Sequence, residues 1–340
     1  MEKTVVVTGG TGYVAGFVAA EFLNRGYAVR SSVRDVSKLE ALQKSLAVFV
    51  AAPVLSRFGV FQADLTSQKG WARAFSGACG IVHVASPLGT GRESARELRE
   101  VAETGTLNVL SAAHEAGVKR VVMTSSQAAS TARAASGKIV LDESFWSDER
   151  NPELDPYRLS KIAAERAAWA FAENCGIQLT TILPGAVFGP VMSGDNISSN
   201  AILRTLLDGG MPKSIDIPFE TSDVRDLAVL HRLAFENESA IGERFLAASQ
   251  TIRMPEVARL YREKYPELKI PSKSFSNFTV RLLAKFVPQV RSLVPMLGRE
   301  YSHTCEKAER ILGWTQRSPS ETVLDAAASL LSFRKAAGEN

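Results

Sequence analysis

Near its N-terminus the chain reads Thr4-Val5-Val6-Val7-Thr8-Gly9-Gly10-Thr11-Gly12-Tyr13-Val14-Ala15-Gly16, and this segment is the strongest indication of the fold. Its β-branched first half predicts a buried parallel strand, and apolar residues at helical spacing follow it over residues 17–23. A strand, a glycine-rich turn and a helix in this order favour a nucleotide site, because a helix N-terminus attracts phosphates. Gly9 suits the tight turn and Gly12 the close approach of a pyrophosphate. The alternative is a tight turn that serves only packing.

The alternation of elements continues along the chain and predicts the architecture. Further strands are expected over residues 27–34, 80–84, 119–124 and 178–183, and helices over residues 93–115 and 156–175. This rhythm predicts an α/β fold, a Rossmann-type doubly wound parallel sheet with a ligand crevice at the carboxyl ends of its strands.

The rhythm loosens after residue 189, which suggests two domains. We expect residues 1–190 to form a nucleotide-binding domain, with residues 220–250 returning to it and residues 243–248 rejoining the sheet. Residues 191–219 and 251–340 are expected to form a smaller, mostly helical substrate-binding domain. The segment 45–55 is unusually apolar for its place, and either a longer helix packed on the body or a contact surface for a partner is expected there.

Composition agrees with a globular enzyme and argues against several other classes. Of the 340 residues, 45% are hydrophobic and 22% are charged, which is enough for a large core. The net charge of +4 is dispersed, without a lysine-rich arm or a basic stripe, so no nucleic acid partner is expected. No apolar run reaches the ~18 residues of a membrane span, and the first strand leaves no room for a signal peptide. No membrane partner is therefore expected, and the cytoplasm is the expected location.

Cysteines and histidines show no metal-binding or disulfide pattern. Cys79, Cys175 and Cys305 are odd in number and widely spaced, so neither a disulfide framework nor a metal site is expected. The four histidines also lack ligand spacing. His83 is the one near the expected crevice, and a structural role is favoured for it over a catalytic one.

Two residues of the helix expected over 156–175 indicate acid catalysis. Tyr157 and Lys161 are four residues apart, so they share a helix face. A nearby ammonium favours the charged form of a tyrosine and lowers its pKa from about 10, so Tyr157 can act as a general acid. The same spacing also occurs by chance, as an exposed lysine beside a half-buried tyrosine.

The end of the second strand indicates which nucleotide is bound. The acidic partner of a ribose 2′-hydroxyl is expected about 20 residues past the glycines, but Val33 and Arg34 stand there. A guanidinium suits a 2′-phosphate as a bidentate partner, so NADP(H) is favoured over NAD(H). Asp35 follows at once and weakens this preference, and Arg34 would also suit a solvated strand end.

The order of the motifs resembles that of one family. The matching segments are the turn over residues 8–16, Arg34, Ala63-Asp64-Leu65, Val82-His83-Val84-Ala85-Ser86-Pro87, Gly105-Thr106-Leu107-Asn108-Val109-Leu110, Val121-Val122-Met123-Thr124-Ser125-Ser126, Tyr157 with Lys161, Leu183-Pro184-Gly185-Ala186-Val187-Phe188-Gly189-Pro190 and Asp223-Val224-Arg225-Asp226. Together they resemble the extended short-chain dehydrogenase/reductases, and within them the dihydroflavonol-reductase-like group of aldehyde and ketone reductases. The resemblance covers nearly the whole chain. One departure is Ala15 in place of the third glycine, with Gly16 displaced by one.

The resemblance implies three catalytic residues. Ser126 would polarise the substrate carbonyl through a hydrogen bond, Tyr157 would protonate it, and Lys161 would both acidify Tyr157 and bind the nicotinamide ribose. Ser125 is the alternative serine, because two adjacent hydroxyls end the strand and alternation turns only one of them inward.

The cofactor that the resemblance implies is NADP(H). Asp64 and Leu65 would flank the adenine, and Asp64 would also suit a helix N-cap with Thr66. The positions expected to contact the cofactor are Gly9, Thr11, Gly12, Tyr13, Val14, Arg34, Asp64, Leu65, Ala85, Ser86, Pro87, Lys161, Pro184, Gly185 and Val187. Those expected to contact the substrate are Leu88, Ser126, Tyr157 and Met192.

The activity implied is the NADPH-dependent reduction of an aldehyde or ketone carbonyl to an alcohol. The substrate is a small molecule that the sequence leaves unidentified, and the chain is expected to be a monomer or a homodimer. One alternative is a nucleotide-sugar epimerase or dehydratase with tightly held NAD, against which Arg34 counts. Another is an NADP-sensing protein without catalysis, against which Tyr157 and Lys161 count.

Overall fold

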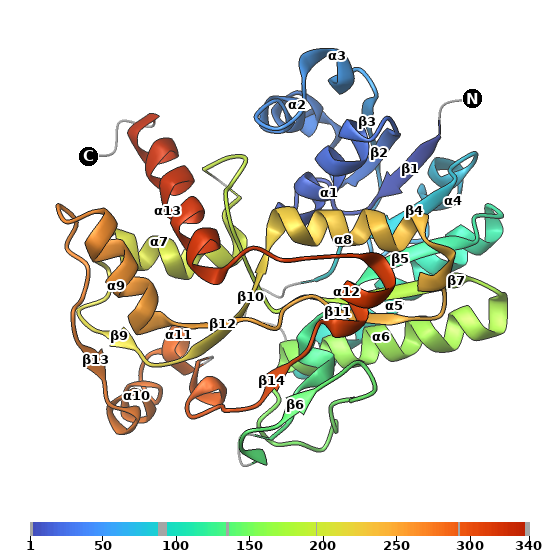
Figure 1. Cartoon of the computed structure of the whole chain (residues 1–340). Coiled ribbons are helices and arrows are strands. Elements are labelled where there is room, and N and C mark those ends of the chain that lie inside the picture. The colour runs from blue at the N-terminus through green and yellow to red at the C-terminus, as the bar shows by residue number, and fades with distance from the viewer. Residues whose placement is uncertain (1–2, 88–93, 134–135, 195, 292, 337–340) are drawn as a thin grey trace.

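A seven-stranded parallel sheet forms the centre of the molecule (Figure 1). The computed structural model describes residues 3–87, 94–133, 136–194, 196–291 and 293–336. The strand order β11-β7-β5-β4-β1-β2-β3 confirms the Rossmann-type doubly wound fold. The strands are β1 Thr4–Val7, β2 Ala28–Val33, β3 Phe58–Gln62, β4 Gly80–His83, β5 Arg120–Thr124, β7 Gln178–Leu183 and β11 Arg244–Leu246.

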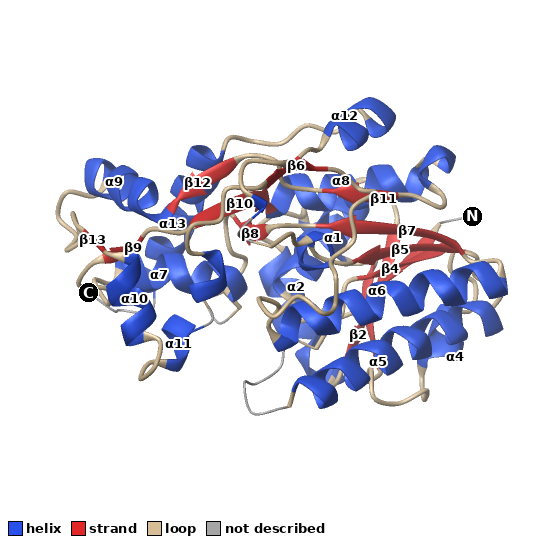
Figure 2. Ribbon diagram, turned by 90° about the horizontal axis from the view of Figure 1, so that it is seen from below, coloured by secondary structure: helices blue, strands red, loops and turns tan. Residues whose placement is uncertain are grey.

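Helices cover both faces of this sheet (Figure 2). Helices α1 Tyr13–Asn24 and α8 Val224–Glu236 pack on one face, and α5 Ala95–Glu115 and α6 Pro156–Cys175 pack together on the other. Successive side chains of a strand point to opposite faces. Val5 and Val7 are therefore buried with residues of α1 and α8, whereas Val6 is buried with residues of α5 and α6.

A second, smaller sheet and short strand pairs lie beyond the central sheet. Strands β8 Ala186–Phe188, β10 Pro218–Asp223 and β12 Thr251–Arg253 form the small sheet, in the order β12-β10-β8. The pairs are β9 Ser214–Ile215 with β13 Ser274–Phe275 and β6 Val140–Leu141 with β14 Ser302–His303. Strand β11 pairs with β7, which confirms that the chain rejoins the central sheet there, while the division into two domains stays a prediction.

The remaining helices are short, apart from the last. They are α2 Leu39–Leu46, α3 Ala52–Leu55, α4 Trp71–Phe75, α7 Ala201–Leu207, α9 Met254–Lys264, α10 Asn277–Leu283, α11 Pro288–Arg291, α12 Glu306–Leu312 and α13 Pro319–Ala336. No helix in the described part of the chain is long and apolar enough to cross a membrane.

The apolar segment 45–55 is not one long helix, so the first of its two alternatives was wrong, and the contact surface for a partner stays a prediction. It contains the end of α2, a turn, and the short α3, which has Pro53 in its first turn. Leu46 and Val50 are buried, and the ring of Phe49 lies 4.9 Å from that of Phe17 on α1. The apolar side chains therefore pack α2 and α3 onto α1, although Val48 stays exposed.

Candidate active site

The glycine-rich turn between β1 and α1 opens at the carboxyl edge of the sheet. Gly9 has a φ of +77°, which favours glycine, and a Cβ there would lie 3.0 Å from Ala85 Cα. The turn is closed by the N–H of Gly12, which donates to the carbonyl oxygen of Gly9 at 2.7 Å. Thr11 and Gly12 are exposed, and α1 has no side-chain cap at Gly12. The first N–H groups of α1 are therefore suited to bind an anion.

Tyr13 contributes its backbone rather than its ring to this edge. Its ring is buried, and its hydroxyl donates to the carbonyl oxygen of Pro190 at 3.0 Å. Val14, next to it in the first turn of α1, is half-buried. Met192 lies on the same side, because a Cβ on Gly16 would be 3.1 Å from its sulfur. Met192 therefore packs against the first turn of α1, and its contact with substrate stays a prediction.

The segment after β4 lies beside the glycine-rich turn. The N–H of Ala85 donates to Thr8 Oγ1 at 2.9 Å, which ties the ends of β4 and β1 together. Ser86 and Pro87 follow and are half-buried, and their role as a wall beside the cofactor stays a prediction. Leu88, which was expected to contact the substrate, lies outside the described residues.

His83 has a structural role in this arrangement. Its Nδ1 lies 2.9 Å from Thr8 Oγ1, and the side chain is buried. Burial, with the charge of Lys161 as a further cause, lowers the pKa of His83 to about 3. The imidazole is therefore neutral at neutral pH, so it has no acidic proton to give.

Arg34 follows β2 and is exposed at the same edge. The next residue, Asp35, is used within its own turn, where its carboxylate accepts a hydrogen bond from the N–H of Ser37 at 2.9 Å. Hydrogen bonds from Ser37 hold the pKa of Asp35 below its usual range. Of these two charges, the guanidinium of Arg34 is thus the one suited to meet a ligand.

Asp64 and Leu65 follow β3 on this edge. The Asp64 carboxylate accepts from the N–H and the hydroxyl of Thr66, at 2.8 and 2.6 Å, and these bonds lower its pKa, with a smaller contribution from the charge of Arg34. This closes a turn, and α4 begins only at Trp71, so the expected helix N-cap is not formed. The carbonyl oxygen of Leu65 accepts from Asn108 Nδ2 at 2.8 Å, which anchors the segment on α5.

Helix α6 starts where its first residues require. The Asp155 carboxylate accepts a hydrogen bond from the N–H of Arg158 at 2.8 Å as the N-cap, and Pro156 occupies the first helical position. This start places Tyr157 in the first turn and Lys161 one turn later. The Lys161 Nζ lies 5.9 Å from the centroid of the Tyr157 ring.

Burial dominates the electrostatics of this pair. It raises the pKa of Tyr157, whereas a hydrogen bond with Ser126 and the charge of Arg158 lower it. Burial also lowers the pKa of Lys161 to about 8, against the opposing charge of Glu165. The acidification of Tyr157 by Lys161 therefore stays a prediction, because the ammonium itself is buried and lies near the ring rather than at the hydroxyl.

The two serines after β5 point in different directions. The Ser126 side chain interacts with Tyr157 and lowers its pKa, and the Ser126 hydroxyl accepts from the N–H of Ala128 at 3.1 Å. Ser125 is buried, and its hydroxyl donates to Glu165 Oε2 at 2.6 Å. The structure therefore brings Ser126, and not Ser125, together with Tyr157.

The segment Pro184 to Val187 runs alongside this serine turn. The carbonyl oxygen of Pro184 accepts from the N–H of Gln127 at 2.9 Å, and the N–H of Gly185 donates to Ser222 Oγ at 3.0 Å. Val187 is buried within β8. Because parallel strands end at one edge, the residues after β1, β2, β3, β4, β5 and β7 all lie at the same edge of the sheet, where the crevice of such folds is expected.

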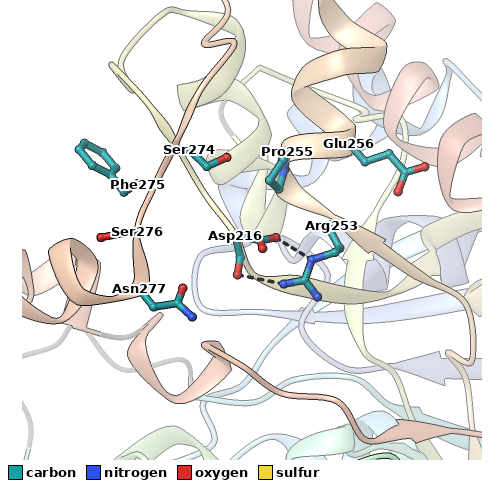
Figure 3. A pocket seen from close by; sticks show the side chains of 8 residues that line it. All are labelled: Asp216, Arg253, Pro255, Glu256, Ser274, Phe275, Ser276 and Asn277. Atoms are coloured by element: carbon teal, nitrogen blue, oxygen red, sulfur yellow. Dashed lines mark hydrogen bonds and ion pairs between the residues drawn. The ribbon is translucent and has the colours of Figure 1, made fainter.

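A separate pocket of about 530 Å³ lies among β9, β12, β13 and the starts of α9 and α10 (Figure 3). Figure 3 shows Arg253 and Asp216 side by side in its lining, and Arg253 Nε donates to Asp216 Oδ1 at 2.6 Å. None of its lining residues is among the expected catalytic or cofactor-binding positions.

Among the described residues, no group of His, Cys, Asp or Glu side chains is arranged to hold a metal ion.

Three residues that hold the site in place were not identified from the sequence: Glu165, Gln127 and Ser222. Glu165 had one available signal, since it lies four residues after Lys161 and so shares its helix face. No sequence signal pointed to Gln127 or Ser222, because their partners in the Pro184–Val187 segment are remote in sequence.

Comparisons with known proteins agree with this geometry. The model of the NAD dependent epimerase/dehydratase family matches residues 5–247. Anthocyanidin reductase from Vitis vinifera is 32% identical over 293 residues, which cover 82% of this chain and 85% of that protein. Cinnamoyl-CoA reductase from Medicago truncatula is 34% identical over 280 residues, or 80% and 83% of the two chains.

A solved structure is also similar over its full length. The yeast methylglyoxal/isovaleraldehyde reductase complexed with NADPH has a TM-score of 0.80 and 25% identity, with 99% of this chain and 100% of that chain covered. The chain therefore belongs to the NAD dependent epimerase/dehydratase family and, within the extended short-chain dehydrogenase/reductases, to the dihydroflavonol-reductase-like group.

Proposed function

We propose that this protein reduces the carbonyl of a small aldehyde or ketone to an alcohol, with NADPH as the reductant. The observation that carries the proposal is that Ser126, which lowers the pKa of Tyr157, and Lys161, one helical turn after Tyr157, both lie beside this phenol. Two relatives support it, because both are reductases by name. The solved neighbour complexed with NADPH supports the choice of cofactor.

The residues of the crevice fit a dinucleotide with a 2′-phosphate. The uncapped start of α1 and the crowded, glycine-dependent turn at Gly9 suit a pyrophosphate that lies close to the backbone. Arg34 is exposed and suits the 2′-phosphate, while the neighbouring Asp35 carboxylate is held by Ser37. Asp64 and Leu65 would border the adenine, and Pro184 to Val187 the nicotinamide amide.

The proposed mechanism assigns one task to each polar group. When bound, NADPH supplies the hydride that adds to the carbonyl carbon. Ser126 donates a hydrogen bond to the carbonyl oxygen, and Tyr157 donates its phenolic proton to the same atom. Because burial raises the pKa of Tyr157, the phenol holds its proton at neutral pH, which suits reduction. Lys161 binds the nicotinamide ribose and, when charged, stabilises the phenolate that is left.

The test is the consumption of NADPH, with NADH in parallel, against aromatic aldehydes, aryl ketones, α- and β-keto esters and dihydroflavonols. Turnover with a preference for NADPH supports the proposal and begins to define the substrate. NADPH binding without turnover of any carbonyl would favour the cofactor-sensing alternative. Purified protein that already carries NAD would favour the epimerase or dehydratase.

A further inference from the structure

Glu165 is a fully buried carboxylate, with 0% of its surface exposed, on the same face of α6 as Lys161. Its Oε2 accepts from Ser125 Oγ at 2.6 Å. Its Oε1 accepts from Thr181 Oγ1 at 2.8 Å and from Arg244 Nε at 2.9 Å. One side chain thus ties α6 to Ser125 just after β5, to Thr181 within β7 and to Arg244 at the start of β11. A buried ion pair is weak evidence for added stability, because desolvation offsets much of its attraction.

Arg244 serves as the fixed counter-ion of Glu165. Its Nη1 donates to the carbonyl oxygens of Glu143 and Phe145, at 2.6 and 3.1 Å. The guanidinium lies 3.7 Å from the ring centroid of Trp146. With its donors used in this way and its surface buried, Arg244 holds Glu165 and does not act as a ligand for substrate.

Ser125 carries the constraint from Glu165 to the catalytic serine. Its N–H donates to the carbonyl oxygen of Ile182 at 2.7 Å, and its hydroxyl donates to Glu165. Both the backbone and the side chain of Ser125 are therefore fixed. Ser126 is the next residue, so the direction of its hydroxyl toward Tyr157 depends on this anchor.

Lys161 lies one helical turn before Glu165, on the same face of α6. Lys161 is only 5% exposed. The negative charge of Glu165 raises the pKa of Lys161, against the effect of burial. The other titratable groups near Lys161 are Tyr157 on the same helix and the neutral His83 from β4. Glu165 is thus the anionic partner that favours a charged Lys161.

We propose that Glu165 is a positioning residue that aims the Ser126 hydroxyl at Tyr157 and supplies the counter-charge of the Lys161 ammonium. The inference rests on the proposed function, in which Ser126 polarises the carbonyl and Lys161 binds the ribose. The two roles can be tested separately. The orientation of the Ser126 hydroxyl depends on Ser125, whereas the effect on Lys161 depends on the charge of Glu165.

The test compares Glu165→Gln, Glu165→Asp and Ser125→Ala. Glu165→Gln should lower kcat by about 10²-fold, as expected for a misplaced catalytic group, with little change in the KM for the carbonyl. NADPH affinity is expected to fall as the pH rises and Lys161 loses its proton. In Glu165→Gln this fall should occur at a lower pH than in the wild type, because Lys161 loses its proton more readily without the carboxylate. Glu165→Asp keeps the charge, so this pH should stay at the wild-type value. Ser125→Ala should lower kcat without moving it.

A matched control is Glu21→Gln, which breaks another largely buried ion pair. Glu21 Oε1 accepts from Arg232 Nε at 2.6 Å, between α1 and α8. This variant should lose thermal stability but keep kcat and the pH dependence of NADPH binding. If Glu165→Gln behaves in the same way, the inference is overturned.

Binding measurements keep the test independent of the substrate. Fluorescence titration with NADPH across pH reports on the charge of Lys161 even if no carbonyl is turned over. The absence of turnover would count against the proposed function alone, and not against the role of Glu165. An unshifted pH dependence in Glu165→Gln would then contradict the inference. If Glu165→Gln does not fold, Ser125→Ala decides, since unchanged kcat in that variant would overturn the positioning of Ser126.

Discussion

Replacing Gly185 by alanine should disrupt the contact between the Pro184–Val187 segment and the serine turn. A Cβ at this position would lie 2.2 Å from the carbonyl oxygen of Glu220, 2.8 Å from Gln127 Oε1 and 2.9 Å from Ala248 Cβ. These neighbours have little freedom to move. The Glu220 oxygen belongs to the backbone of β10, and Gln127 is held by a 2.7 Å hydrogen bond from its Nε2 to the Ala248 carbonyl oxygen.

The size of the effect follows from this crowding. Gly185 is not among the glycines with a positive φ, so overpacking rather than backbone strain sets the cost. Overpacking costs about 1–3 kcal/mol, and the upper end is expected because the nearest atom is backbone oxygen far inside contact distance. Movement of Pro184 also loosens its hydrogen bond with Gln127, next to Ser126, so kcat should fall by about 10²-fold.

The assay is urea unfolding together with NADPH turnover, with Gly59→Ala as the control. Gly59 lies in β3, and apart from its own atoms and those of its two chain neighbours no atom lies within 4 Å of the Cβ position there. Its substitution should change the free energy of unfolding by less than about 0.5 kcal/mol and leave turnover unchanged. If Gly185→Ala matched this control in both measurements, the packing described around the serine turn would be refuted.

Two further predictions concern the cofactor and acid stability. Arg34→Ala should weaken NADPH binding by about 10- to 100-fold, which is the contribution of hydrogen bonds to a charged group, and should leave NADH binding unchanged. Fluorescence titrations measure both affinities. Equal losses of affinity for NADPH and NADH would assign Arg34 no role at the 2′-phosphate. Burial lowers the pKa of His83 to about 3 and that of His231 to about 4, while the unfolded chain binds these protons near pH 6.5. The free energy of unfolding should therefore fall as the pH drops from about 6.5 toward 3, and less steeply in His83→Asn. Urea unfolding across this pH range measures how the free energy of unfolding depends on pH in the wild type and in His83→Asn. The same dependence in both proteins would contradict the conclusion that His83 is buried in its neutral form.

Local signals predicted the elements that build the site. Helix α6 and strand β7 have the expected bounds, Pro156–Cys175 and Gln178–Leu183, because the helix start and the β-branched run are local features. The segment 45–55 was misjudged for a related reason. Its apolar composition fits a long helix, but Pro53 favours a new helix start, and a composition argument does not register this.

Contacts between residues that are far apart in the chain could not be predicted from a single sequence. Glu165 meets Ser125, Thr181 and Arg244, which are 40, 16 and 79 residues away. Alternation predicted that only one of Ser125 and Ser126 points inward, and the family resemblance favoured Ser126. The turn after β5 decides which hydroxyl lies beside Tyr157. The crowding at Gly185 likewise depends on β10, which no local pattern places beside it.

The most direct test of the central claim is the rate of carbonyl reduction by Tyr157→Phe, with NADPH binding measured on the same preparation. The variant keeps the ring and loses only the hydroxyl that faces Ser126. We expect unchanged NADPH affinity and turnover lowered by about 10²–10⁴-fold, the usual contribution of a general acid. A variant that binds NADPH and reduces the carbonyl as fast as the wild type would contradict the assignment of Tyr157 as the proton donor.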